Sequence, residues 1–309
     1  MPSRGNAQGL DAKTARRARR QRPTRPVELQ DRLNRRLYHP LAWRLASALA
    51  RTPATPNQVS VLGALMVMAA AYAYSRPGWP LPALAGLALH MAWHVVDGAD
   101  GDLARLTGRS GPKGELVDGI CDYAGHIVLY LTLGAMLVPA LGGWAWVAVV
   151  ASGACRIVQA NQYECLRRQY AWWVYGTPWL RRAPLEGQGR GHALLTALAE
   201  GYLRLGASTA PANDAIDAIL DGATPAQRNA HRDVIRRHFA PLLQRSQILS
   251  ANYRTLALGG SMLAGTPLWF LGFEIVLLSL ASLAIAAQQA RVTAATRADL
   301  AQPSPSTSR

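Results

Sequence analysis

The chain has 309 residues, of which 50% are hydrophobic and only 17% are charged. Soluble domains carry about 25% charged residues, so this composition argues against an ordinary soluble protein and favours a membrane protein. The formal net charge of +15 predicts a partner rich in negative charge, such as an anionic membrane surface or a phosphate-bearing substrate. The 3 cysteines lack the spacing of a metal site, so we expect them to be small core residues.

The N-terminal part of the chain is basic. Residues 1–35 form an arginine-rich arm without apolar periodicity. We expect this arm to be disordered and to lie on an anionic cytoplasmic membrane surface. Nucleic acid is not an expected partner, because no aromatic residues are interleaved with the arginines. Residues 36–51 combine apolar and basic residues at helical spacing, with Trp43 among them, which is typical of an amphipathic helix in the membrane interface.

Six apolar stretches follow and predict a bundle of six transmembrane helices, since a helix needs about 20 residues to cross a bilayer. Four of them fall within residues 52–165, and the first opens with Thr-Pro-Asn, a typical helix start. Residues 166–250 are amphipathic and charged, which predicts a helical insertion in the cytoplasm or on the membrane surface. Two more spans occupy residues 251–292, and residues 293–309 form a polar tail. The predicted fold class is therefore all-α and integral to the membrane.

The distribution of positive charge predicts the orientation of these spans. An even number of spans places both termini on the same side of the membrane. Basic residues gather in the N-terminal arm, in the turn after the second span and in the insertion, whereas the opposite turns contain only Arg76. Because cytoplasmic loops are enriched in lysine and arginine, we expect both termini and the turn after the second span to be cytoplasmic.

That turn belongs to an acidic segment, DGADGDLARLTGRSGPKGELVDGICD, which starts at Asp97. Asp97 and Asp100 are three positions apart, and Asp118 and Asp122 are four apart, so each pair lies on one face of a helix. A glycine-rich turn between the helices would bring the two pairs opposite each other. Four converging carboxylates repel one another unless a cation neutralises them. Oxygen ligands without histidine or cysteine favour Mg²⁺, with Mn²⁺ also suitable, and two such ions would suit displacement at phosphorus.

Smaller residues and one arginine stand between the aspartates. Gly101 and Gly114 allow backbone or ligand to approach closely. Ala104 is small, and Arg105 could face a phosphate. Asp102 falls off the face shared by the first two aspartates, so we expect it to point to solvent.

Together these residues give the pattern Asp-x2-Asp-Gly-x2-Ala-Arg-x8-Gly-x3-Asp-x3-Asp. This pattern resembles the signature of the CDP-alcohol phosphotransferases, or CDP-alcohol phosphatidyltransferases, an integral-membrane family of phospholipid synthesis. The resemblance covers residues 36–165 and, more loosely, the last two spans. It implies that three aspartates hold the metals and that the fourth completes the site and acts as general base on the acceptor hydroxyl. In chain order these are Asp97, Asp100, Asp118 and the proposed base Asp122.

The resemblance further implies that Gly101, Ala104 and Gly114 line the cytidine-nucleotide pocket and that Arg105 steadies the site or the diphosphate. The acceptor oxygen would attack the phosphorus on the alcohol side of the CDP diphosphate, and CMP would leave. The expected partners are a CDP-linked lipid donor and an alcohol acceptor. By the same resemblance we expect a homodimer in the inner membrane of a bacterium.

Two other side chains bear on the site. Arg156 stands midway along the fourth predicted span, where an unpaired charge is costly. We expect it to contact the phosphate of the acceptor or the diphosphate, with an ion pair to one of the aspartates as the alternative. A phosphate contact favours a polar acceptor and CDP-diacylglycerol as donor, but the acceptor itself stays open. His126 follows Asp122 by four positions and could orient it, although a core histidine is the more common outcome.

Two other functions are compatible with an acidic cluster in a helical membrane protein. An intramembrane Mg²⁺-dependent prenyltransferase would carry two aspartate-rich motifs far apart in sequence, and this chain has one cluster. A divalent-ion transporter would distribute charges along several helices, for which only Arg156 and Glu274 are available. The spacing of the aspartates therefore favours the CDP-alcohol phosphotransferase.

Overall fold

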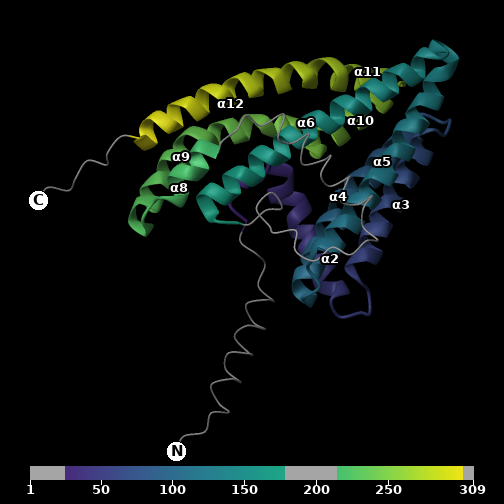
Figure 1. The fold of residues 1–309 in the computed structure, drawn as a ribbon. Coiled ribbons are helices and arrows are strands. Elements are labelled where there is room, and N and C mark those ends of the chain that lie inside the picture. The colour runs from purple at the N-terminus through teal and green to yellow at the C-terminus, as the bar shows by residue number, and fades with distance from the viewer. Residues whose placement is uncertain (1–24, 178–213, 302–309) are drawn as a thin grey trace, which may run out of the picture. The chain divides into compact units, whose positions relative to one another are not determined.

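A computed structural model of the protein describes residues 25–177 and 214–301, and all its regular elements are helical (Figure 1). Three helical runs are long and apolar enough to cross a membrane: Pro56–Tyr74, Gly114–Leu141 and Leu268–Ala301. They coincide with the first, third and sixth predicted spans, while the other three spans stay predictions. Most of the basic arm, the middle of the insertion and the end of the polar tail lie outside the described residues.

The chain divides into two compact units. The first unit comprises Met1–Val149 and Thr255–Pro267, and the second comprises Val150–Arg254 and Leu268–Arg309. The predicted aspartate site belongs to the first unit. Arg156 belongs to the second.

Helical structure in the first unit begins before the boundary predicted from the sequence. A short 3-10 turn, η1 (Val27–Leu29), is followed by the π-helical η2 (Asn34–Tyr38), which runs into α2 (His39–Leu49). Asp31 is the reason for this early start. Its side chain accepts a hydrogen bond of 2.9 Å from the backbone N–H of Asn34, so it caps the first helical turn. The last residues assigned to the basic arm are therefore ordered by a local cap.

Three long helices form the centre of the first unit. They are α3 (Pro56–Tyr74), α4 (Leu81–Thr107) and α5 (Pro112–Leu141), and α3 packs along both of the others (Figure 1). The Thr-Pro-Asn sequence starts α3 as predicted. Thr55 and Gln58 form a capping box, in which each side chain accepts a hydrogen bond from the backbone N–H of the other residue.

The glycine-rich turn between α4 and α5 is short. Gly108 ends α4 with φ +70°, a left-handed conformation that glycine adopts without strain. Pro112 then opens α5, and proline suits the first turn of a helix. Both aspartate pairs consequently lie on continuous helices that flank one tight turn.

The second unit contains the described part of the insertion and the last helical run. α6 (Trp144–Tyr175) begins in the first unit and continues well past the predicted end of the fourth span. After the undescribed residues, α8 (Asp214–Asp221) and α9 (Pro225–Ser246) both pack against α12 (Leu278–Ala301). The indole N–H of Trp173 in α6 donates to Asp217 in α8 at 2.8 Å, which connects the insertion to α6.

A short 3-10 turn, η5 (Gln247–Leu249), joins α9 to α10 (Ala251–Leu263), which passes from the second unit into the first. The last helical run consists of α11 (Leu268–Gly272), η6 (Phe273–Leu277) and α12. It contains one π-helical segment, η6, and a fully buried acidic residue, Glu274, lies in that segment. The run extends to Ala301, into the part of the chain predicted as a polar tail.

Candidate active site

The four predicted aspartates come together between α4 and α5. Carboxylate oxygens of Asp97, Asp118 and Asp122 all lie within 4.8 Å of one another, and these side chains are half-buried. Asp100 is buried, and its carboxyl group lies within hydrogen-bonding reach of Asp118. The helical spacing therefore places one pair of carboxylates opposite the other, as the sequence predicts.

The cluster gathers negative charge in a small space. Among the side chains that the structure describes, no arginine forms a salt bridge with Asp97, Asp100 or Asp118. Carboxylates this close repel one another strongly when they are ionised. A set of oxygen donors without histidine or cysteine fits a hard divalent cation. The residues present therefore fit the metal that the sequence predicts.

Ser60 is a site residue that the sequence analysis missed. Its hydroxyl donates to Oδ2 of Asp100 at 2.6 Å, and the backbone N–H of Gly101 donates to Oδ1 of the same carboxylate. Both oxygens of Asp100 thus have a fixed donor, which sets the orientation of a proposed ligand. Ser60 belongs to α3, and the one signal for it in the sequence is a polar residue one turn into an apolar helix.

The small residues of the motif leave room beside the carboxylates. An added Cβ at Gly114 would meet no atom within 4 Å. At Gly101 the nearest atoms are those of the Arg105 guanidinium, at 3.5 Å for Nη1 and 3.6 Å for Nη2. Ala104 is half-buried in the next turn of α4. The contact of these four residues with a nucleotide stays a prediction.

Asp102 differs from the expectation. The sequence predicts that it points to solvent, but it is only 2% exposed. Its carboxylate forms ion pairs with Arg105 in the next turn and with Arg25, at 2.8 Å, in the N-terminal segment. The prediction is wrong because these two guanidinium groups compensate the buried charge.

An aromatic layer lies one helical turn from the aspartates. Trp93 packs between two histidines, with ring centroids 4.5 Å from His94 and 4.8 Å from His126. Nε2 of His94 lies within hydrogen-bonding distance, 2.9 Å, of the hydroxyl oxygen of Thr255. Nδ1 of His126 lies 2.8 Å from the main-chain oxygen of Asp122 rather than from its carboxylate. His126 is therefore a core histidine that packs α5 against α4.

In the second unit, Arg156 faces the carboxylate of Glu274. The distance from Nη1 of Arg156 to Oε1 of Glu274 is 3.7 Å, and Nη1 of Arg254 lies 2.6 Å from the same oxygen. Ser152 donates to the other oxygen at 2.6 Å, and Gln159 accepts from Arg254 at 2.9 Å. Arg156 thus shares a buried carboxylate with Arg254. Its contact with a phosphate, and the alternative of an ion pair with one of the aspartates, both stay predictions.

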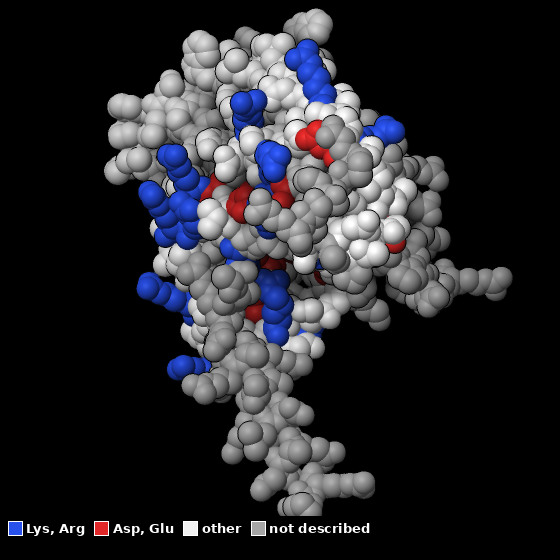
Figure 2. Space-filling view, turned by 90° about the vertical axis from the view of Figure 1, so that its left-hand side faces the viewer, with Lys and Arg blue, Asp and Glu red and all other residues white. Residues whose placement is uncertain are grey.

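The wider surface is rich in positive charge. Figure 2 shows one face of the molecule, on which both arginine and acidic side chains are exposed. With a formal net charge of +15 on the whole chain, such a surface attracts anionic ligands. A diphosphate is a ligand of this kind.

Comparison with known families adds the decisive observation. The family model described as CDP-alcohol phosphatidyltransferase matches residues 53–184. The chain belongs to this family through that segment. The matched residues contain α3, α4 and α5 and all four aspartates. A comparison with curated protein sequences finds no match.

Membership of the CDP-alcohol phosphatidyltransferase family defines the class of reaction. The protein is a membrane transferase of phospholipid biosynthesis that moves a substituted phosphate from a CDP-alcohol to an acceptor alcohol. Enzymes of this family are typically metal-dependent, and Asp97, Asp118 and Asp122 could hold such an ion. These findings favour the transferase over the prenyltransferase and the ion transporter.

Proposed function

We propose that the protein transfers a phosphatidyl group from CDP-diacylglycerol to a polar acceptor alcohol and releases CMP. The observation that carries this proposal is the convergence of Asp97, Asp118 and Asp122, whose carboxylate oxygens lie within 4.8 Å of one another. Such a cluster requires a cation, and a cation beside a nucleotide diphosphate is a means of transferring phosphate. The acceptor is left open, with a phosphorylated alcohol favoured over a neutral one.

Mg²⁺ is the proposed metal, with Mn²⁺ able to replace it. Asp97, Asp100, Asp118 and Asp122 would hold it, supported by the Ser60 hydroxyl on Asp100. When bound, the ion would polarise the phosphoryl oxygens and neutralise the charge that develops on them. The carboxylates position it on helices rather than on loops, which favours a precise geometry.

Asp122 is the proposed general base. It would take the proton from the acceptor hydroxyl as that oxygen forms a bond to the phosphorus on the diacylglycerol side of the donor. The bond from this phosphorus to the CMP oxygen breaks at the same time, so the products are a phospholipid and CMP. Gly101, Ala104 and Gly114 would line the nucleotide pocket, with Arg105 on the diphosphate.

Arg156 is proposed to contact a phosphate of the acceptor or the donor. It shares Glu274 with Arg254, so two guanidinium groups face one carboxylate. The presence of two guanidinium groups at one carboxylate supports an anionic ligand near Arg156.

The placement of the protein in the cell is also proposed. Six spans with both termini and the aspartates on the cytoplasmic side fit the distribution of basic residues. The expected setting is the inner membrane of a bacterium, with a homodimer as the assembly.

The test is a transfer assay on membranes that contain the full chain. Labelled CDP-diacylglycerol and Mg²⁺ should yield CMP and a labelled lipid with one member of a panel of alcohols. Asp122→Asn should abolish CMP release while the protein still inserts. Asp233→Asn is the matched control, because Asp233 lies on α9 with a side chain that is 71% exposed. Normal turnover by Asp122→Asn, or by the wild type in EDTA, would overturn the mechanism.

A further inference from the structure

Asp102 joins two arginines that are far apart in the sequence. Its Oδ1 accepts hydrogen bonds from Nη2 of Arg25, at 2.8 Å, and from Nη2 of Arg105. The side chain of Asp102 is 3% exposed, whereas those of Arg25 and Arg105 are 30% and 51% exposed. Charge-assisted hydrogen bonds of this kind are the strong ones in proteins. Two guanidinium groups on one carboxylate also leave an excess of positive charge at this point.

Arg105 lies directly over the backbone of the motif. Its guanidinium nitrogens are 3.5 and 3.6 Å from the position of a Cβ at Gly101, the residue that follows Asp100. Among the described residues, Asp102 is the hydrogen-bond partner of Arg105. A guanidinium carries several N–H donors, so a half-exposed Arg105 keeps donors for an anionic ligand. The direction of those donors depends on how Asp102 is held.

The segment that supplies Arg25 is itself fixed in place. We call residues 25–31 the N-terminal strap. The side-chain amide of Gln30 donates to the main-chain oxygens of Arg25, at 2.6 Å, and Pro26, at 3.2 Å. The other end of the same amide, Oε1 of Gln30, lies 2.8 Å from Nδ1 of His39, the first residue of α2. The strap is thus connected to α2 by one clamping side chain.

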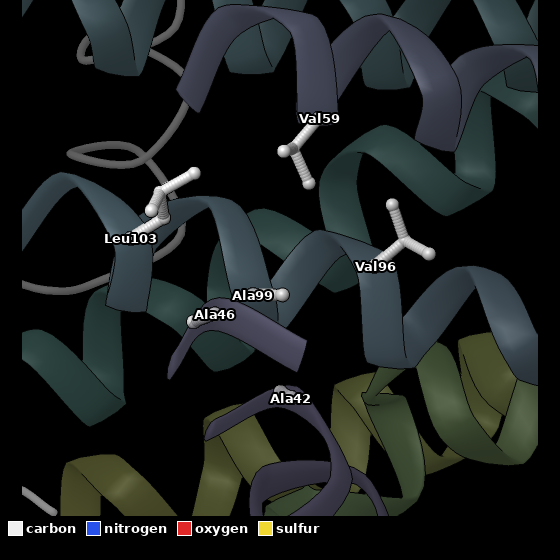
Figure 3. Packing of buried hydrophobic residues seen from close by; sticks show 6 residues of the cluster. All are labelled: Ala42, Ala46, Val59, Val96, Ala99 and Leu103. Carbon is white, nitrogen blue, oxygen red and sulfur yellow. The ribbon is translucent and has the colours of Figure 1, made fainter. Parts of the chain in front are cut away.

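Helix α2 in turn packs closely on α4. Figure 3 shows the small residues Ala42 and Ala46 of α2 beside Ala99 and Leu103 of α4, and all four are 0% exposed. A Cβ at Gly98 would lie 3.1 Å from the Cβ of Ala42, so the helices approach as closely as their backbones allow. These contacts fall on the turns of α4 that carry the motif. A continuous packed route therefore runs from the strap to Arg105.

We infer that Arg25 is a positioning residue that acts through Asp102 to hold Arg105 in place for the diphosphate of the donor. This inference rests on the proposed function, because that function supplies the diphosphate. Arg25 holds Oδ1 of Asp102, and because Arg105 donates to the same oxygen, Arg105 is confined above Gly101. Fixing a long side chain before binding reduces the entropy that the ligand must otherwise supply. The competing explanation is that Arg25 contributes only general positive charge.

Kinetics on the full chain in membranes separate these explanations. Arg25→Ala should raise the KM for CDP-diacylglycerol about tenfold and change kcat less than about twofold, because the lost interaction orients a binding group. Arg25→Lys, which keeps a charged donor, should restore most of the affinity. Arg32→Ala is the matched control, since Arg32 is exposed just after the strap. Equal effects of Arg25→Ala and Arg32→Ala would overturn the inference.

A double-mutant cycle tests the route through Asp102. In an Asp102→Asn background, Arg25→Ala should raise the KM no further, because the carboxylate it holds is already gone. Effects that multiply independently would show that Arg25 does not act through Asp102. Thermal unfolding in detergent verifies that each variant is folded. If Arg25→Ala fails to fold, Arg25→Gln takes its place, because it keeps polarity and removes the charge.

Binding of CDP in the presence of Mg²⁺, measured by calorimetry on the purified full chain, distinguishes the two proposals. If the wild type releases no CMP, the proposed function fails, while weaker CDP binding by Arg25→Ala than by Arg32→Ala still supports the role of Arg25. If the wild type turns over but Arg25→Ala binds CDP normally, only the positioning role is overturned. A wild type that neither turns over nor binds CDP overturns both.

Discussion

Two clusters of charged side chains lie on apolar helices of this protein, and they differ in how their charge is balanced. In the first unit, carboxylates gather on α4 and α5, and no arginine with a described side chain forms a salt bridge with Asp97, Asp100 or Asp118. In the second unit, the carboxylate of Glu274 is fully buried and pairs with Arg254 at 2.6 Å. The chain itself thus compensates the carboxylate of the second cluster, whereas the first cluster could hold a metal ion.

This difference separates the proposed metal site from the structural ion pair of Glu274 and Arg254. A buried ion pair whose hydrogen bonds are satisfied stabilises one arrangement of its helices. Removing one partner destabilises the fold, because the other charge is then buried without compensation. A cluster of like charges does the opposite, because repulsion favours separation of the helices until a ligand binds. Substitutions in the aspartate cluster should therefore affect activity, and substitutions of Glu274 or Arg254 should affect folding.

The largest expected effect is that of Asp118→Asn. The change removes one proposed metal ligand and one negative charge, so CMP release should fall by about 10³-fold or more. The thermal unfolding temperature should stay the same or rise, because repulsion within the cluster is reduced. Transfer assays and unfolding in detergent measure the two quantities. A stable variant that retains a tenth of the wild-type turnover would contradict the assignment.

The next effect is on stability. Glu274→Ala leaves Arg254 buried without its carboxylate, which should lower the free energy of unfolding by about 3–5 kcal/mol. The double variant Glu274→Leu with Arg254→Met should recover much of this loss, since it removes both charges. Chemical unfolding of the purified protein measures both values. A double variant that is no more stable than Glu274→Ala would show that the pair is not the source of the effect.

The same comparison explains what the sequence could predict. The four aspartates follow from spacing within two adjacent helices, so helical geometry alone brings them together. Ser60 and Asp100 are 40 positions apart, and Arg25 and Asp102 are 77 apart. Contacts at such separation depend on how the helices pack, and a local sequence pattern does not predict helix packing. The sequence therefore predicts that Asp102 points to solvent, since one of the two guanidinium groups that pair with it comes from the distant N-terminal strap.

The fold shows a similar division. The cap at Thr55 and the turn at Gly108 are local signals, and the structure contains both. The start of helical structure near Asp31 was missed because arginines dominate that part of the sequence, and a single capping residue outweighs them. Composition therefore predicts which stretches are apolar more reliably than where each helix begins or ends.

Metal binding should stabilise the first cluster and leave the second unaffected. Mg²⁺ at about 100 times its Kd should raise the free energy of unfolding by about 2.7 kcal/mol if the unfolded chain does not bind it. Asp97→Asn should lose most of this increment, while Glu274→Gln should retain it. Unfolding with Mg²⁺ and with EDTA measures the increment for each variant. An increment in Asp97→Asn equal to that of the wild type would place the metal elsewhere.

The smallest expected effect compares two serines in equivalent roles. Ser60 donates to Asp100 at 2.6 Å, and Ser152 donates to Glu274 at 2.6 Å. Ser60→Ala frees the carboxylate of a proposed ligand, so the Mg²⁺ concentration for half-maximal activity should rise about tenfold. Ser152→Ala should leave that concentration unchanged and lower the free energy of unfolding by about 1.5–3 kcal/mol, because it removes a hydrogen bond to a buried charge. If the two variants gave the same Mg²⁺ requirement, the hydroxyl of Ser60 would be a packing contact, and the metal site would end at α4 and α5.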